Sequence, residues 1–289
     1  MKVAGFTIIR NAIKYDYPVV EAITSILPVC DVFYVGVGNS EDATRALIES
    51  IASDKIRIID TVWDDTLREG GKVLSVETNK VFDAIPSEFE WCFYIQSDEC
   101  VHEADLPVIT TAMKTNVGDT GIDGLLFEYK HFYGQYNYIG IGRRWYKHEI
   151  RIVRNNKNIR SYKDAQGFRM MDGKKLRVKT SGAFIHHYGW VKPPKAQQAK
   201  QNDFHKMWHD DAWVKKNIAA VEEFDYSNID LLEIYKGTHP AVFQDRINKS
   251  RWDFKYDKKR VKTNLKYRFL FWVEKLTGWR IGENRNYTL

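Results

Sequence analysis

The stretch Trp91-Cys92-Phe93-Tyr94-Ile95-Gln96-Ser97-Asp98-Glu99 runs from an apolar, aromatic segment directly into an amide, a small residue and two carboxylates. A short apolar run that ends at acidic residues is typical of a buried strand in an α/β sheet. Ligands of open α/β sheets bind beyond the carboxyl ends of the strands, where Asp98 would lie. A carboxylate there can hold a hard divalent cation, and the cation can hold a diphosphate. The alternative is a strand followed by an acidic turn in solvent.

The residues around this stretch alternate between strand and helix patterns. We expect strands at Val3–Ile9, Asp31–Val37, Ile56–Ile59 and Trp91–Ile95, with helices between them at Pro18–Leu27, Glu41–Ala52 and Lys72–Ile85. This order predicts a mainly parallel sheet. Beyond residue 120 we expect strands at Gly124–Tyr129, Ile150–Arg154 and Ala183–His187, separated by long polar and aromatic loops, and then helices at Ala196–Trp208, Asp211–Glu223 and Lys262–Leu276.

The composition is that of an ordinary globular protein, with 44% hydrophobic and 28% charged residues among 289. No run approaches the ~18 apolar residues of a membrane span, and no signal peptide is recognisable. The three cysteines, Cys30, Cys92 and Cys100, show no metal-site spacing, so we expect a reduced, cytoplasmic setting. The net charge of +6 is concentrated in 251–289, which holds eleven Lys or Arg against four Asp or Glu. We find no nucleic-acid recognition motif.

Two common site motifs fail on inspection. Gly36-Val37-Gly38 follows a strand, but the third glycine of a dinucleotide fingerprint is missing. Glu41 and Asp42 would also repel a pyrophosphate from the start of the next helix, which excludes a nicotinamide or flavin dehydrogenase. His205 and His209 are four residues apart, yet Lys206 stands where a zinc protease has glutamate.

Further polar residues have both a structural and a functional interpretation. Glu149 and Arg151 alternate on one strand face, which would suit a structural ion pair. Asp164 lies in a glycine-containing loop, where it is either a turn former or a general base. His187 closes a strand, where it is either a packed histidine or a second ligand of a cation at Asp98.

Together these segments resemble bacterial family 2-type glycosyltransferases of the GT-A fold, the type that builds cell-surface polysaccharide or lipopolysaccharide. The resemblance covers about residues 1–200. It is carried by Arg10-Asn11, Asn39–Thr44, Asn79, Gln96–Glu99 in place of an Asp-x-Asp segment, and the stretches His131–Gly134, Glu149–Arg151, Asp164–Arg169 and His187–Pro194.

The resemblance implies a single Rossmann-like mixed sheet flanked by helices, a GT-A-like catalytic domain over 1–195 and a basic, helical extension over 196–289. It implies an inverting, hexosyltransferase-like enzyme that moves a sugar from a nucleotide-diphosphate sugar to a saccharide or lipid-linked acceptor. Mn²⁺ or Mg²⁺ would be held by Asp98 and His187, and the catalytic base would be Asp164, with Glu149 as the alternative. The donor nucleotide would contact Arg10, Asn39, Asn79, Gln96, Ser97 and Arg151. The acceptor sugar would stack on Tyr133, Tyr136, Trp145 or Trp190, although the two tryptophans could equally be core residues.

Two positions depart from the family pattern. Val37-Gly38 stands where members usually carry an aspartate for the nucleotide base, and Gln96 replaces the first acid of Asp-x-Asp. Two other functions therefore stay open. One is a nucleotidyltransferase on a related α/β fold, although Ile13–Asp16 is not the glycine- and lysine-rich loop it needs. The other is a carbohydrate-binding protein with a degenerate metal site.

The basic segment 260–279 predicts an amphipathic helix. Leu265, Phe269, Trp272, Val273 and Leu276 would form one apolar stripe, interleaved with lysine and arginine. Such a stripe suits peripheral contact with the inner face of an anionic membrane. It suits packing against the catalytic domain equally well, because an amphipathic pattern cannot name its partner.

Overall fold

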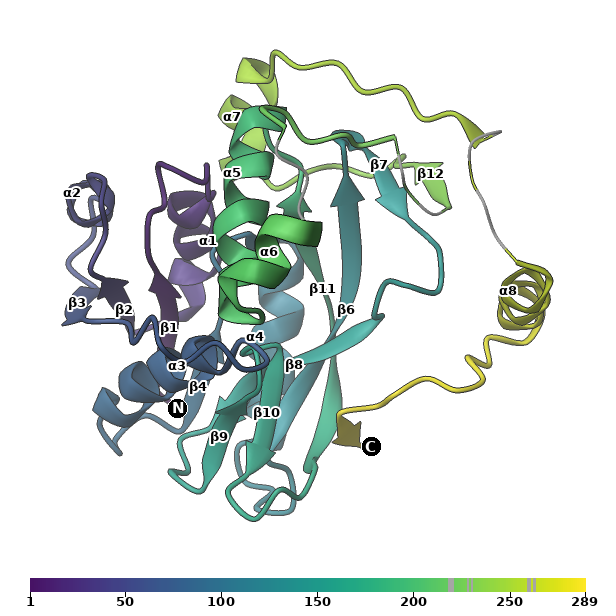
Figure 1. Ribbon diagram of the computed structural model, residues 1–289. Helices are drawn as coiled ribbons and strands as arrows, with labels where there is room; N and C mark the ends of the chain where they lie inside the picture. Colours follow the sequence, from purple (N-terminus) through teal and green to yellow (C-terminus); the bar gives the residue numbers. More distant parts are fainter. Residues whose placement is uncertain (218–220, 228, 230, 259–260, 262–263) are drawn as a thin grey trace.

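The computed structural model describes residues 1–217, 221–227, 229, 231–258, 261 and 264–289, and its centre is one large mixed sheet (Figure 1). In order, its main path runs through β12 (Leu232–Ile234), β7 (Gln135–Gly140), β6 (Gly124–Tyr133), β8 (His148–Arg154), β4 (Trp91–Tyr94), β1 (Val3–Ile9), β2 (Val32–Gly38) and β3 (Ile56–Thr61). β11 (Leu176–Trp190) joins it beside β6. The predicted fold class, an α/β protein with a mixed sheet flanked by helices, is confirmed.

The parallel half of the sheet comes from the first hundred residues. Its strands are β1 (Val3–Ile9), β2 (Val32–Gly38), β3 (Ile56–Thr61) and β4 (Trp91–Tyr94), within two residues of the expected bounds. β1 pairs in parallel with both β2 and β4, so β1 lies between them. All seven residues of β1 are buried, as expected for a strand covered on both faces.

Helices cover both faces of this half. α1 (Val19–Ile26), α2 (Thr44–Glu49) and α4 (Leu106–Asn116) place Ile23, Ile48 and Ile109 in the core of one face. α3 (Lys72–Ala84) places Val81 and Phe82 in the core of the other. The first two helices lie within the predicted ranges. α2 is shorter than predicted because Asp42, expected inside it, lies before it and accepts a hydrogen bond from the backbone N–H of Thr44, the first residue of the helix. Short 3₁₀ turns, η1 (Leu27–Val29) and η2 (Glu103–Asp105), follow α1 and precede α4.

The second half of the sheet is mostly antiparallel. β8 (His148–Arg154) joins β4 to β6 (Gly124–Tyr133), and β11 (Leu176–Trp190) runs parallel to β6 and antiparallel to β5 (Glu99–Val101). The long loops predicted here are wrong in part. They contain β7 (Gln135–Gly140) and a hairpin of β9 (Ile159–Tyr162) and β10 (Gly167–Met170). β7 begins with alternating polar and aromatic side chains, a pattern typical of a strand with one buried face.

The C-terminal segments return to the sheet. α5 (Pro194–Phe204), η3 (His205–Met207) and α6 (Asp211–Asn217) follow β11. Of the helix predicted at Asp211–Glu223, residues 218–220 lie outside the described part and residues 221–223 are not helical. β12 (Leu232–Ile234) pairs with β7, and β13 (Tyr287–Thr288) pairs with β11. Between them come η4 (Ala241–Phe243), α7 (Gln244–Lys249) and α8 (Leu265–Thr277). α8 lies at the periphery, away from the other helices (Figure 1). Within the described residues, no helix is long and apolar enough to cross a bilayer.

Candidate functional site

A pocket of about 640 Å³ opens at the carboxyl ends of β1 and β4 and is covered by α5 and η3. This volume is in the range of small-molecule sites. The pocket contains six of the ten predicted site residues: Arg10, Gln96, Ser97, Asp98, Asp164 and His187. The other four, Asn39, Asn79, Glu149 and Arg151, are not among its lining residues.

Asp98 is buried at the floor of the pocket, with only 8% of its surface exposed, so the acidic turn does not lie in solvent. Its Oδ2 accepts a hydrogen bond from Lys200 Nζ at 3.1 Å, and Lys200 comes from α5. Burial alone would raise the pKa of Asp98, but the neighbouring Lys200 ammonium, above all, holds it well below its usual range. Asp98 is therefore an ionised carboxylate with one oxygen engaged.

His187 presents a free lone pair to the other oxygen of Asp98. His131 Nε2 donates to the carbonyl of Tyr146 at 2.8 Å, and burial lowers the pKa of His131 well below its usual value. A neutral His131 must then accept at Nδ1 from His187 Nδ1, which lies 3.0 Å away. Neutral His187 is thereby left unprotonated at Nε2, 3.8 Å from Asp98 Oδ1. This second partner orients the imidazole as it does in metal-ligating histidines.

The two residues predicted to hold the cation lie 3.8 Å apart, close enough to share one ion. Two ligands that are each about 2.1 Å from one cation lie at most about 4.2 Å apart. Gly189 leaves the space open, because a Cβ there would be 2.7 Å from His187 Nε2 and 2.8 Å from Asp98 Oδ2. No group of three His, Cys, Asp or Glu within the described residues could hold a metal, so substrate oxygens would have to complete the coordination.

Asp164 lies in a strained loop at the same pocket. Both of its neighbours, Lys163 and Ala165, adopt left-handed backbone conformations, with φ of 54° and 59°. Non-glycine residues rarely adopt these angles, and such strain is concentrated at functional sites. Burial raises the pKa of Asp164, as required of a group that is to accept a proton near neutral pH.

Three predicted site residues hold the loop that carries Asp164 in place through hydrogen bonds. Gln96 Nε2 donates to the carbonyl of Ala165 at 3.1 Å, and Arg151 Nη1 donates to that of Gln166 at 2.7 Å. Glu149 Oε1 accepts from the side chain of Gln166 at 2.8 Å. The expected ion pair between Glu149 and Arg151 is wrong. Arg151 instead forms a bidentate pair with Glu99, at 2.7 and 2.8 Å.

Glu149 itself is a buried acid that forms no ion pair within the described part of the chain. Its Oε2 is buried and has no hydrogen-bond partner among the described residues. Burial raises the pKa of Glu149 to about 8, against the opposing influence of Arg151 and Gln166. A carboxyl group that is protonated at neutral pH is a poor general base, which favours Asp164 over Glu149 for that role.

Replacing Glu149 by Gln should remove a pH dependence of folding stability. Between its unfolded pKa near 4.5 and its folded pKa of about 8, Glu149 binds a proton in the folded state that it loses on unfolding. Wild-type stability therefore falls as pH rises through this window. We expect the melting temperature of Glu149→Gln, relative to wild type, to rise between about pH 5 and about pH 9. Glu128→Gln, an exposed carboxylate on β6, should leave the wild-type profile unchanged, and the same profile in both variants would contradict the assignment.

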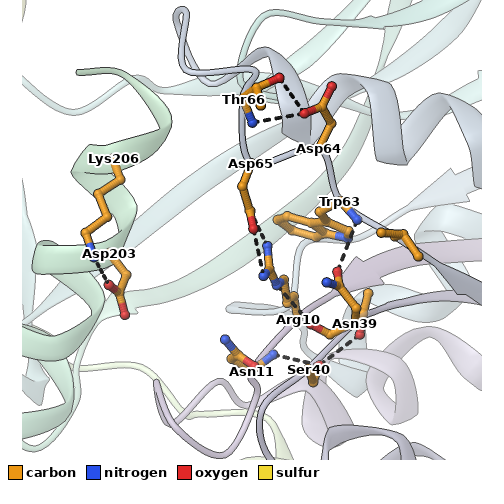
Figure 2. A network of polar contacts seen from close by, with 12 residues as sticks. Arg10, Asn11, Asn39, Ser40, Trp63, Asp64, Asp65, Thr66, Asp203 and Lys206 are labelled. Atoms are coloured by element: carbon orange, nitrogen blue, oxygen red, sulfur yellow. Dashed lines mark hydrogen bonds and ion pairs between the residues drawn. The ribbon is translucent and has the colours of Figure 1, made fainter. Parts of the chain in front are cut away.

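Arg10, which lines the pocket, and Asn39 belong to one network of polar contacts (Figure 2). Arg10 pairs with Asp65 at 2.5 Å and donates to the carbonyl of Asn39 at 3.1 Å. Asn39 Oδ1 accepts from the backbone of Trp63, whose indole packs against Gly38. A Cβ at Gly38 would lie 2.4 Å from that indole, so the family's aspartate could not stand here without displacing Trp63.

Asn79 and most of the predicted stacking residues have packing roles. Asn79 exchanges hydrogen bonds with the backbone of Ser161 at 2.8 and 3.2 Å, which ties α3 to β9. Tyr133, Tyr136 and Trp145 are buried in two aromatic clusters, so the core interpretation holds for them. Trp190 does line the pocket.

Lys200 is the pocket residue that the sequence did not reveal. The helix predicted at Ala196–Trp208 has no apolar stripe, yet α5 buries Gln197, Gln198 and Lys200. The polar sequence of this helix was the available signal. A helix without an apolar face has little reason to be buried unless it packs over a polar site. Burial lowers the pKa of Lys200, but Tyr17 and Asp98 more than offset this and raise it, so its ammonium stays charged.

No protein-family model matches the sequence, and no curated protein matches it. Among solved structures, TarS of S. aureus is similar over 70% of this chain and 38% of its own, with 16% identity and a TM-score of 0.40. Glucosyl-3-phosphoglycerate synthase of Mycobacterium tuberculosis, in complex with Mn²⁺, uridine diphosphate and phosphoglyceric acid, is similar over 46% of this chain and 43% of its own, with 18% identity and a TM-score of 0.30. This chain spans less than half the length of either. Similarity of this degree says nothing of substrate, so function has to be inferred from the site itself.

Proposed function

We propose that this protein is a glycosyltransferase that uses a nucleotide-diphosphate sugar. The observation that carries the proposal is one pocket that joins the Asp98–His187 pair, the Lys200 ammonium and the carboxylate of Asp164, whose two neighbours have left-handed backbone conformations. The pair, through a bound cation, and the ammonium would suit an anionic diphosphate, and the Asp164 carboxylate would suit a hydroxyl that must lose a proton.

In this proposal the reaction inverts the anomeric carbon. Asp164 accepts the proton of an acceptor hydroxyl, whose oxygen attacks the anomeric carbon from the face opposite the diphosphate. The new C–O bond forms as the bond to the leaving group breaks, and the nucleoside diphosphate departs with the bonding electrons. Lys200 would lie beside the developing negative charge, where a fixed cation in a buried site is most effective. Arg10, Gln96 and Ser97 would contact the donor.

Asp98 and His187 would hold Mn²⁺ or Mg²⁺, which when bound neutralises charge on the diphosphate. Lys200 already bonds Asp98, so we expect the ion to bind well only together with the diphosphate, whose oxygens would complete its coordination.

We further propose a saccharide or lipid-linked acceptor in cell-surface glycan synthesis, at the inner face of the membrane. The division into a catalytic domain over 1–195 and an extension over 196–289 remains a proposal, with α5 of the extension contributing to the pocket.

Asp98→Asn should abolish the joint stabilisation of the protein by Mn²⁺ and a nucleoside diphosphate. Wild type is expected to melt higher with uridine diphosphate and Mn²⁺ together than with either alone, since ligands that bind only the folded state stabilise it. His187→Ala should weaken the same coupling. His186→Ala is the control, because His186 faces away from the pocket and bonds Tyr235. Full coupling in Asp98→Asn would exclude this cation site.

The enzyme itself is tested by incubating purified protein with a panel of sugar nucleotides and measuring release of the nucleoside diphosphate. Release that depends on Asp164 supports transfer. Tight sugar binding without release would instead indicate a carbohydrate-binding protein, and release of inorganic pyrophosphate from a nucleoside triphosphate would indicate a nucleotidyltransferase.

A further inference from the structure

The outer face of α8 carries a continuous apolar stripe. Leu265, Phe269, Trp272 and Leu276 follow one another at spacings of four, three and four residues, and their exposed fractions are 82%, 60%, 59% and 64%. The alternative of packing against the catalytic domain is therefore wrong for these four residues, and only Val273 of the expected stripe is partly covered. Trp279, just beyond the helix, is 63% exposed and extends the same apolar surface.

The inner face of α8 is held by polar contacts. Glu274 is buried and bonds Arg143 and Lys147, both at 2.6 Å. The hydroxyl of Tyr267 accepts from the backbone of Arg143 at 2.5 Å. Just after the helix, Arg280 donates to the carbonyls of Arg143 and Trp145, both at 2.7 Å. The helix thus turns its polar side to the protein and its apolar side to solvent, the reverse of an ordinary surface helix.

Basic side chains border the stripe. Lys266, Arg268 and Lys275 are exposed on α8, and Glu274, the one acid of the helix, is turned inward. The exposed face therefore combines large apolar side chains with positive charge. This combination complements the boundary between the acyl chains and the negative headgroups of an anionic bilayer.

We propose that the outer face of α8 docks the protein on an anionic membrane surface, with Phe269 and Trp272 inserted among the lipids. Asn264 caps the start of the helix through the backbone of Tyr267, and Gly278 ends it, so the face is formed before it meets lipid. The anchoring residues 143–147 adjoin the pocket, because Trp145 stacks on His131 at 5.1 Å and His131 bonds His187. Docking would hold the pocket near a lipid-linked acceptor, and only this last consequence rests on the proposed function.

The test compares full-length wild type with Phe269→Ser/Trp272→Ser in co-sedimentation with vesicles of phosphatidylcholine alone and with phosphatidylglycerol added. Neither the donor nor an acceptor is present, so failure of docking and failure of glycosyl transfer are separate results. Wild type should bind the anionic vesicles, more weakly at high salt, and the double variant should bind on the order of ten-fold more weakly. Lys266→Glu/Arg268→Glu should lose the preference for anionic lipid. Met171→Ser, an equally exposed apolar residue elsewhere, should bind like wild type.

A second copy of this chain is the competing occupant of the face. Light scattering of wild type and the double variant decides between them. A wild-type dimer that the double variant disrupts, together with no binding to either kind of vesicle, would overturn the proposal in favour of self-association. Equal vesicle binding by wild type and the double variant would overturn it as well.

Discussion

Replacing Asp164 by Asn is expected to lower sugar transfer by at least about 10²-fold, the usual contribution of a general base. Asparagine keeps the size and hydrogen-bonding capacity of the side chain but cannot take up the proton of the acceptor hydroxyl. Donor affinity should be unchanged, because the proposed diphosphate contacts are at Asp98, His187 and Lys200. The measurement is the transfer rate at saturating donor, together with the donor dissociation constant.

Two variants sharpen this result. Asp172→Asn alters an exposed carboxylate in the turn after β10 and should transfer at the wild-type rate. Glu149→Gln should retain most of the activity, because Glu149 positions the loop through Gln166 and does not line the pocket. If Asp164→Asn transfers normally and Glu149→Gln does not, the catalytic base is Glu149.

The parallel half of the fold could be predicted because local signals agree there. The run from Trp91 to Tyr94 is apolar and ends at acids, and the strand at Val3–Ile9 is apolar throughout. Pro18 and Pro28 bracket α1, which limits that helix without reference to the rest of the chain. For the same reason Asp98 could be placed at the carboxyl edge of the sheet from sequence alone.

The site could be predicted only where strand ends define it. Arg151 was expected to pair with Glu149 two positions away, but its partner is Glu99, 52 residues earlier. Lys200 reaches Asp98 across 102 residues. Such contacts form only when the folded chain brings a particular helix over the end of a particular strand. The residues next to Arg151 or Lys200 in the sequence give no signal of that arrangement. The orientation of α8 could not be predicted either. Its amphipathic pattern predicts a helix, but the pattern is the same whether the apolar stripe faces the protein or the solvent.

Arg151→Met is expected to cost roughly 3–5 kcal/mol of folding stability, the usual effect of removing one partner of a buried ion pair. Arg151 and Glu99 are both fully buried, and Glu99 also accepts from the hydroxyl of Tyr129 at 2.6 Å and the backbone of Gln96 at 3.0 Å. Without the guanidinium, the Glu99 carboxylate would be left in a buried site with only neutral donors. At about 2–4 °C per kcal/mol for a chain of this class, the melting temperature should fall by roughly 10 °C.

The double variant Glu99→Gln/Arg151→Met separates the charge from the packing. It removes both ions, so its loss of stability should be smaller than that of Arg151→Met alone, whereas independent contributions would make it larger. Arg151→Lys keeps a positive charge. A single ammonium group, however, cannot form two parallel bonds to Glu99 and also donate to the carbonyl of Gln166. We therefore expect Arg151→Lys to fold with a moderate loss of stability and to transfer sugar slowly, because the loop that carries Asp164 loses one support. An Arg151→Met protein as stable as wild type would show that the pair contributes nothing to the fold.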